Sequence, residues 1–80
     1  MLKLDVGNNN KIKDVSFMKN LKKLSAYGNC GINQNGIEEL DLIELYVDHN
    51  EKIKDVSFMK NLKKLSAWGN CGINQNNWYL

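Results

Sequence analysis

The sequence predicts a stacked array of short repeat units rather than a globular fold built from distinct parts. Residues 11–35 and 52–76 are the same 25-residue string with one change, Tyr27 against Trp68. Inside this 41-residue double repeat lies a finer period, with apolar residues at the first, fourth and sixth positions of each unit and Asn at the ninth. A fixed period indicates one supersecondary unit used repeatedly, each copy burying its apolar face against its neighbours.

Four such units, 1–20, 21–41, 42–61 and 62–80, make up a single domain. Apolar residues at the fourth and sixth positions predict a strand with one buried face, because side chains alternate across a strand. The side chains expected to point inward are Leu4 and Val6, Leu24 and Ala26, Leu45 and Val47, and Leu65 and Ala67. An isoleucine after each Asn is expected to be buried as well, at Ile12, Ile32, Ile53 and Ile73.

An asparagine follows each predicted strand, and we expect it to be buried where the chain turns. A buried Asn amide can donate to and accept from the turning backbone, whose polar groups would otherwise lack partners. With one such residue in each unit, the array would carry a structural Asn ladder. Its members are Asn9, Asn29, Asn50 and Asn70.

The segments that return to the next strand are short and of two types. In the first and third units, Asp14 and Asp55 are predicted to cap a helical turn. Units of this length favour single turns or 3₁₀ segments over full helices.

The strings L-x-x-L-x-L-x-x-N and I-x-D-V-S-x-M-x-N-L-x-x-L resemble the short, internalin-like branch of the leucine-rich repeat family. This resemblance covers the whole chain. It implies an α/β-type leucine-rich repeat: a right-handed solenoid of four coils, with a parallel β-sheet on the concave face and short 3₁₀ or helical turns and loops on the convex side. It also implies binding of a macromolecule on the concave face. The chain departs from the family in having few repeats and no cap before its first strand.

Composition argues against several classes of partner. The net charge is only +2 and all eleven basic residues are Lys, whereas bidentate contacts with bases and phosphates favour Arg. We therefore expect no nucleic acid partner. No apolar run approaches the length of a membrane span and the first residues do not resemble a signal peptide, so we expect no membrane association and a cytoplasmic location.

The residues that could carry chemistry do not form a recognisable site. Cys30 and Cys71 lie two units apart, roughly 10 Å at the usual strand spacing, so we expect free thiols that are buried or half-buried. His49 lies between them in sequence, but this spacing does not match a metal-ligand pattern. No nucleophile has an evident base and orienting acid. We therefore predict no enzyme, no cofactor and no metal.

The outward positions of the strands carry aromatic side chains on what would be the concave face. Tyr27, Tyr46, Asp48 and Trp68 are the candidate protein-binding residues there, because aromatic side chains are enriched at interfaces. The alternative is that these side chains pack across strands and only stiffen the sheet.

The ends of the array are expected to expose apolar surface, because a repeat buries its core only between neighbours. The candidate residues for self-association there are Met1, Leu4, Val6, Trp78 and Leu80. Trp78 would either cap the last unit or pack on another chain. We predict self-association through the ends, most simply as a two-fold homodimer.

The near-identity of the two long repeats has two explanations, recent duplication or deliberate design, and we favour design. The sequence thus predicts a non-catalytic repeat scaffold that self-associates through uncapped ends. The alternative is a protein-binding module that uses its aromatic concave face.

Overall fold

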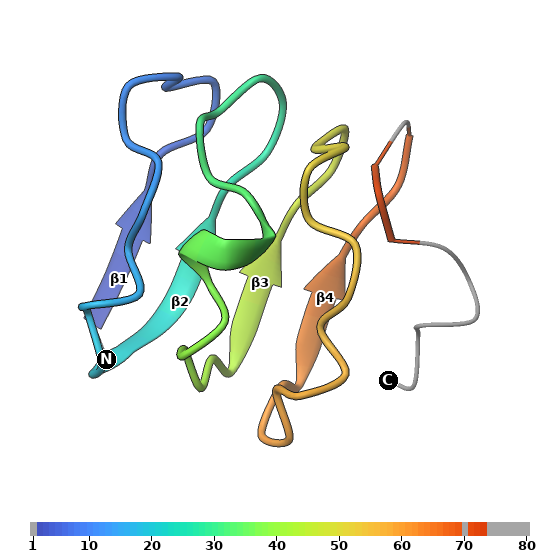
Figure 1. Ribbon diagram of the computed structural model, residues 1–80. Helices are drawn as coiled ribbons and strands as arrows, with labels where there is room; N and C mark the ends of the chain where they lie inside the picture. Colours follow the sequence, from blue (N-terminus) through green and yellow to red (C-terminus); the bar gives the residue numbers. More distant parts are fainter. Residues whose placement is uncertain (1, 70, 74–80) are drawn as a thin grey trace.

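A computed structural model describes residues 2–69 and 71–73 and contains a single parallel sheet of four strands. The strands are β1 (Leu2–Asp5), β2 (Leu21–Ser25), β3 (Glu44–Tyr46) and β4 (Lys64–Ser66). They lie side by side in the order β1-β2-β3-β4, which is also their order in the sequence (Figure 1). Each predicted unit therefore supplies one strand.

The register of the strands follows the repeat. Leu4 pairs with Leu24, Leu24 with Leu45, and Leu45 with Leu65, so the fourth positions of all four units lie in one row across the sheet. The pairing is regular except for a shift between Leu2 and Lys3 in β1. The predicted alternation of inward and outward side chains is thus carried from one strand to the next.

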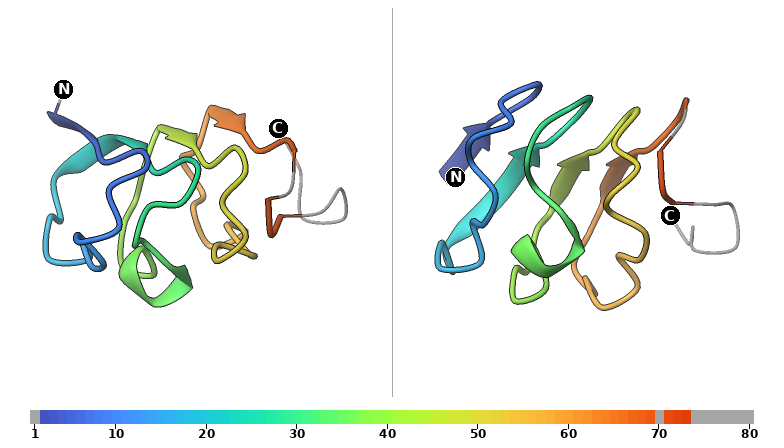
Figure 2. Two further views of the ribbon diagram at one scale, coloured as in Figure 1. Left: turned by 90° about the horizontal axis from the view of Figure 1, so that it is seen from above. Right: turned by 45° about the horizontal axis from the view of Figure 1, so that its top comes forward.

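The segments that connect the strands all lie on one side of the sheet (Figure 2). The apolar core fills the space between the sheet and these segments, and it includes six of the eight side chains predicted to point inward. Leu4 and Leu65, in the two outer strands, pack against the core but are only partly buried. The opposite face of the sheet carries no covering segment in the described part of the chain (Figure 2).

The turn after each strand contains one residue with positive φ. In the first and third units this residue is Asn8 or His49, and in the second and fourth it is Gly28 or Gly69. Gly28 is required for a second reason, since a Cβ atom there would overlap the Asn8 side-chain oxygen.

The predicted Asn ladder is wrong at Asn29, which is exposed. The second unit has one more residue between its positive-φ position and the buried turn position, so Cys30 rather than Asn29 reaches the interior. Cys30 Sγ lies 3.2 Å from Ala26 O, the same carbonyl that the Asn50 amide binds at 2.7 Å. Asn50 is 1% exposed and fits the prediction. Asn9 is exposed as well, so the prediction that it is buried is wrong in this structure. Asn70 lies outside the described residues.

The return segments form turns, and the predicted helical turns after Asp14 and Asp55 are absent. Each aspartate does accept a bond of the capping type, at 2.8 Å from the backbone N–H of Ser16 or Ser57. The first turn closes with Met18 N to Val15 O at 3.0 Å, and the chain turns again with Leu21 N to Met18 O at 3.0 Å, so no continuous helix forms. Within the described ranges the helical element is η1 (Gln34–Gly36), a 3₁₀ turn.

Candidate functional site

Two surfaces are candidates for function, and the first is the uncovered side of the sheet. We call it the outer sheet face; its side chains form three rows across the strands. The first row is Lys3, Lys23, Glu44 and Lys64, the second Asp5, Ser25, Tyr46 and Ser66, and the third Gly7, Tyr27, Asp48 and Trp68. All four predicted binding residues, Tyr27, Tyr46, Asp48 and Trp68, therefore lie on one face.

A polar network fixes the third row at its β4 end. The Asp48 carboxylate accepts from Ser66 Oγ at 2.7 Å and from the Trp68 backbone N–H at 3.1 Å. The Trp68 indole Nε1 donates in turn to Ser66 Oγ at 3.0 Å. The Trp68 side chain is nevertheless 68% exposed, and its ring centroid lies 6.4 Å from that of His49. Trp68 is thus a large apolar group that is oriented by hydrogen bonds and open to solvent.

The side chains at the centre of the outer sheet face are less available for binding a partner, because they contact one another. Tyr46 is half-buried and its hydroxyl donates to Glu44 Oε1 at 2.8 Å. This bond to a carboxylate raises the pKa of Tyr46, because the phenolate would lose it. Lys23 Nζ lies 3.8 Å from the same Glu44 oxygen and 5.5 Å from the Tyr46 ring centroid. Of the three predicted aromatic binding residues, Tyr27 and Trp68 are therefore exposed, whereas Tyr46 mainly joins β2 to β3 through Lys23.

Tyr27 lies next to Gly7, the residue at the β1 end of the third row. A Cβ atom on Gly7 would overlap the Tyr27 ring, so the absence of a side chain at residue 7 makes room for it. Tyr27 remains 38% exposed. Its contact with Gly7 is of the cross-strand type, so one side of the ring is already used.

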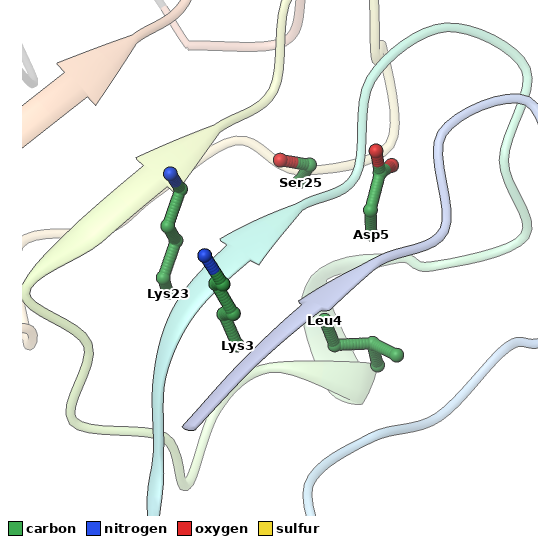
Figure 3. Close-up of a pocket in the computed structure, with 5 residues that line it drawn as sticks. All are labelled: Lys3, Leu4, Asp5, Lys23 and Ser25. Carbon is green, nitrogen blue, oxygen red and sulfur yellow. The ribbon is translucent and has the colours of Figure 1, made fainter. Parts of the chain in front are cut away.

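A shallow hollow lies over β1 and β2 on this face (Figure 3). Lys3, Asp5, Lys23 and Ser25 point out of the sheet there, while Leu4 points to the other side (Figure 3). The hollow offers two ammonium groups and one carboxylate, and Lys23 is already shared with Glu44.

The second candidate surface is on the first unit. Because residues 11–35 recur as 52–76, the exposure of each side chain there can be compared with that of its copy. Ile12 and Ile53 are the same residue in the two copies, yet Ile12 is 37% exposed and Ile53 is 0% exposed. Met18 is half-buried, whereas its copy Met59 is 1% exposed.

Two further pairs behave in the same way. Phe17 is 73% exposed while its copy Phe58 is only partly exposed and packs against the core. Asn9 is exposed while Asn50, at the matching place, is buried and donates to Ala26 O, Cys30 Sγ and Ile32 O.

The two copies differ in what precedes them. The segments that follow them, 21–32 and 62–73, are identical except for Tyr27 and Trp68. Only the third unit also has a unit packed before it, residues 21–41. That preceding unit therefore accounts for the extra burial, and the same surface is uncovered on the first unit. We call this surface the front face; its residues are Leu2, Leu4, Asn9, Ile12, Phe17 and Met18.

The predicted end residues differ in their burial. Leu4 is half-buried, but Val6 is 3% exposed and belongs to the core, so its prediction as a contact residue was wrong. Val6 belongs to the same core cluster as Leu24 and Ala26 of the second unit. Met1, Trp78 and Leu80 lie outside the described residues. Sequence reasoning missed Phe17 and Met18, although comparison of the two copies of the repeat points to them.

The thiols agree with the prediction, since Cys30 is free and buried and Cys71 is free and half-buried. Burial raises the pKa of the Cys30 thiol by desolvation. Among the described residues, no three His, Cys, Asp or Glu side chains are grouped so that they could hold a metal ion. His49 is exposed in its turn.

Comparison with family models, with curated proteins and with solved structures gives no significant match. No helix in the described ranges has the length and apolar character needed to cross a bilayer.

Proposed function

We propose that the chain is a non-catalytic leucine-rich repeat scaffold that self-associates through its front face. The observation that carries this proposal is the comparison of matched copies. Ile12 is 37% exposed where Ile53 is 0% exposed, and Phe17 is 73% exposed where its copy packs against the core. A surface that is an interface in one copy is solvent-exposed in the other.

The physical driving force is removal of apolar area from water. Leu2 at 50%, Ile12 and Phe17 are among the exposed large hydrophobic side chains, and all three belong to the first unit, whose strand β1 is at one edge of the sheet. Burial of such area stabilises by roughly 25 cal/mol per Å². A contiguous exposed apolar patch on a small protein marks an interaction site more often than scattered apolar residues do.

The fold supports the interpretation of the chain as a repeat scaffold. A right-handed solenoid accounts for four parallel strands in sequence order, for short connections on one side of the sheet and for a register that follows the repeat. In such an array each unit contacts only its neighbours, so an end unit is suited to receive another unit.

The test is the molar mass by size-exclusion chromatography with light scattering, over a dilution series with reductant present. We expect a mass above one chain that falls on dilution. The double variant Ile12→Glu and Phe17→Glu should be monomeric, because two charges would be desolvated in the contact. The matched control, Tyr27→Ala on the outer sheet face, should associate as the unmodified chain does. A monomer at all concentrations, or association that survives the two charges, would contradict the proposal.

An alternative function, protein binding by the outer sheet face, is favoured by one observation. Trp68 is 68% exposed although Asp48 and Ser66 hold its backbone and indole N–H groups. An oriented, solvent-exposed indole has the character of a binding hot spot. In the experiment above, loss of association in the control rather than in the front-face variant would favour this second function.

A further inference from the structure

We propose that the partner of the front face is the opposite end of a second copy of this chain, docked head to tail. In this arrangement residues 62–73 of one copy cover the first unit of the next copy. They do so as residues 21–32 cover the third unit within each chain. This inference rests on the proposed self-association and specifies its geometry, which differs from the two-fold dimer expected from the sequence.

The required occupant is defined by the interface inside the chain. The third unit is covered by the second, residues 21–41, in part through Gln34, whose side chain bonds the backbone of Lys54 and Asp55. Segment 21–32 of this cover recurs as 62–73 with Trp68 in place of Tyr27, whereas the counterpart of 33–41 lies outside the described residues. The covered residues 52–61 recur as 11–20 without change. Each chain therefore carries, at opposite ends of its sheet, a second copy of the covered segment and a second copy of the 21–32 part of its cover.

At the end of the array formed by the fourth unit, described residues are more exposed than their copies in the second unit. Cys71 is half-buried where its copy Cys30 is 0% exposed. Leu65 is likewise half-buried where Leu24 is 0% exposed. We call this surface the rear face; its described residues are Leu65 and Cys71. No described residue makes with it the contact that the third unit makes with the second.

The polar groups at the two faces are complementary. Within the chain, the Asn50 amide donates to Ala26 O at 2.7 Å, to Ile32 O at 3.3 Å and to Cys30 Sγ at 3.4 Å. Lys52 Nζ donates to Cys30 O at 3.0 Å.

On the first unit the corresponding donors, Asn9 and Lys11, are exposed. On the fourth unit the corresponding acceptors are Ala67 O, Ile73 O and the sulfur and carbonyl oxygen of Cys71. A docked second copy would therefore give Asn9 the buried environment that the repeat assigns to this position.

One pair of residues distinguishes the junction between copies from the interface inside the chain. Lys23 faces Glu44 inside the chain, with Nζ 3.8 Å from the carboxylate. The corresponding pair at the junction would be Lys64 and Lys3, which carry like charges. The junction is therefore weaker than the internal interface, and its affinity should rise with salt.

Complementation between two blocked variants tests the geometry. The front-blocked chain carries Ile12→Glu with Phe17→Glu, and the rear-blocked chain carries Cys71→Glu; circular dichroism checks that both are folded. In head-to-tail docking each is monomeric alone, and an equimolar mixture forms one heterodimer and nothing larger, because one intact front face and one intact rear face remain. The unmodified chain, with both faces intact, should instead grow beyond two chains as its concentration rises.

Other outcomes separate the two proposals. If the rear-blocked chain still forms a homodimer, the front faces meet about a two-fold axis, so self-association stands and head-to-tail docking fails. If the unmodified chain is monomeric at all concentrations, self-association itself fails.

A second variant gives an independent test without introducing a clash. Lys3→Glu places at the junction the residue type found at the matching internal position. Since Lys3 is exposed, the fold should tolerate the change. Head-to-tail docking predicts an association constant about two- to fivefold higher, the usual range for an exposed ion pair. Unchanged or weaker association would overturn the head-to-tail geometry.

Discussion

The Asn50 amide nitrogen lies 3.4 Å from Cys30 Sγ, so two different residue types occupy neighbouring places in one buried column. Each satisfies the Ala26 carbonyl, Cys30 at 3.2 Å and Asn50 at 2.7 Å. The column passes from the second unit to the third and connects the turns at the ends of β2 and β3. Asn9 is in position to extend it but is exposed, because no unit precedes it in the structure.

The first prediction concerns this column. Asn50→Ala should lower the free energy of unfolding by about 2–3 kcal/mol, because buried backbone groups lose their partners. Asn9→Ala should cost less than about 0.5 kcal/mol, as expected for an exposed position. Urea unfolding at a concentration where the chain is monomeric measures both. Equal losses in the two variants would show that burial of the amide is not what stabilises the turn.

A second prediction uses the duplicated isoleucines. Ile53→Ala removes a side chain that is 0% exposed and should cost about 2–5 kcal/mol. Ile12→Ala makes the same chemical change at a side chain that is 37% exposed, so its cost should be less than half as large. The two unfolding midpoints in urea provide the comparison. Similar midpoints would contradict the assignment of the front face as uncovered.

The third prediction concerns acid pH. Hydrogen bonds from the side chain and backbone of Ser16 lower the pKa of Asp14, and those from Ser57 lower the pKa of Asp55 in the same way. A carboxylate whose pKa is lower in the folded state stabilises that state above its unfolded pKa, about 3.9. This stabilisation should be lost as pH falls through the lower, folded pKa.

Asp14→Asn with Asp55→Asn preserves an acceptor oxygen for the turn but removes the titration. The gap in stability between the unmodified chain and this variant should be constant from about pH 6 to 5 and should shrink below about pH 4. Thermal unfolding across this range measures the gap. If it did not change with pH, the two aspartates would not contribute to the acid sensitivity.

The fourth prediction concerns the two thiols. Cys30 is 0% exposed and burial raises its pKa, so its thiolate is both scarce and inaccessible. Cys71 is half-buried and should be alkylated by iodoacetamide at least about tenfold faster in the monomer. Mass spectrometry of peptides over a time course distinguishes the sites. Faster labelling of Cys30 would be incompatible with its place in the core.

Much of the fold could be predicted from the sequence because its signals are local. The alternation around Leu24 and Leu45 defines one buried face, and the repeat then defines the row that these residues form across the sheet. The buried position in each turn was harder to predict. The number of residues between the positive-φ residue and the buried residue differs between units. Gly28 allows one more residue before the interior is reached, so Cys30 takes the place expected for Asn29.

The candidate surfaces could be predicted only in outline. Asp48 and Trp68 share a face because their positions in the repeat match, but the bond from Ser66, two residues before Trp68, to Asp48 depends on how β4 pairs with β3. The exposure of Phe17 and Met18 has no local signal, because the same residues are better covered in the second copy. What separates the copies is the presence of a preceding unit, which is a tertiary property.

Disulfide trapping tests the central claim most directly. In Asn9→Cys, head-to-tail docking places the new thiol beside Cys71 of the preceding copy, as Asn50 lies beside Cys30 within the chain. Oxidation with diamide, which takes up the two electrons and two protons released, should give a ladder of covalent multimers whose peptides join positions 9 and 71. Adding Cys71→Ser should abolish the ladder, and Asn50→Cys should form the corresponding internal bond with Cys30. An internal disulfide without any link between positions 9 and 71 would contradict the account.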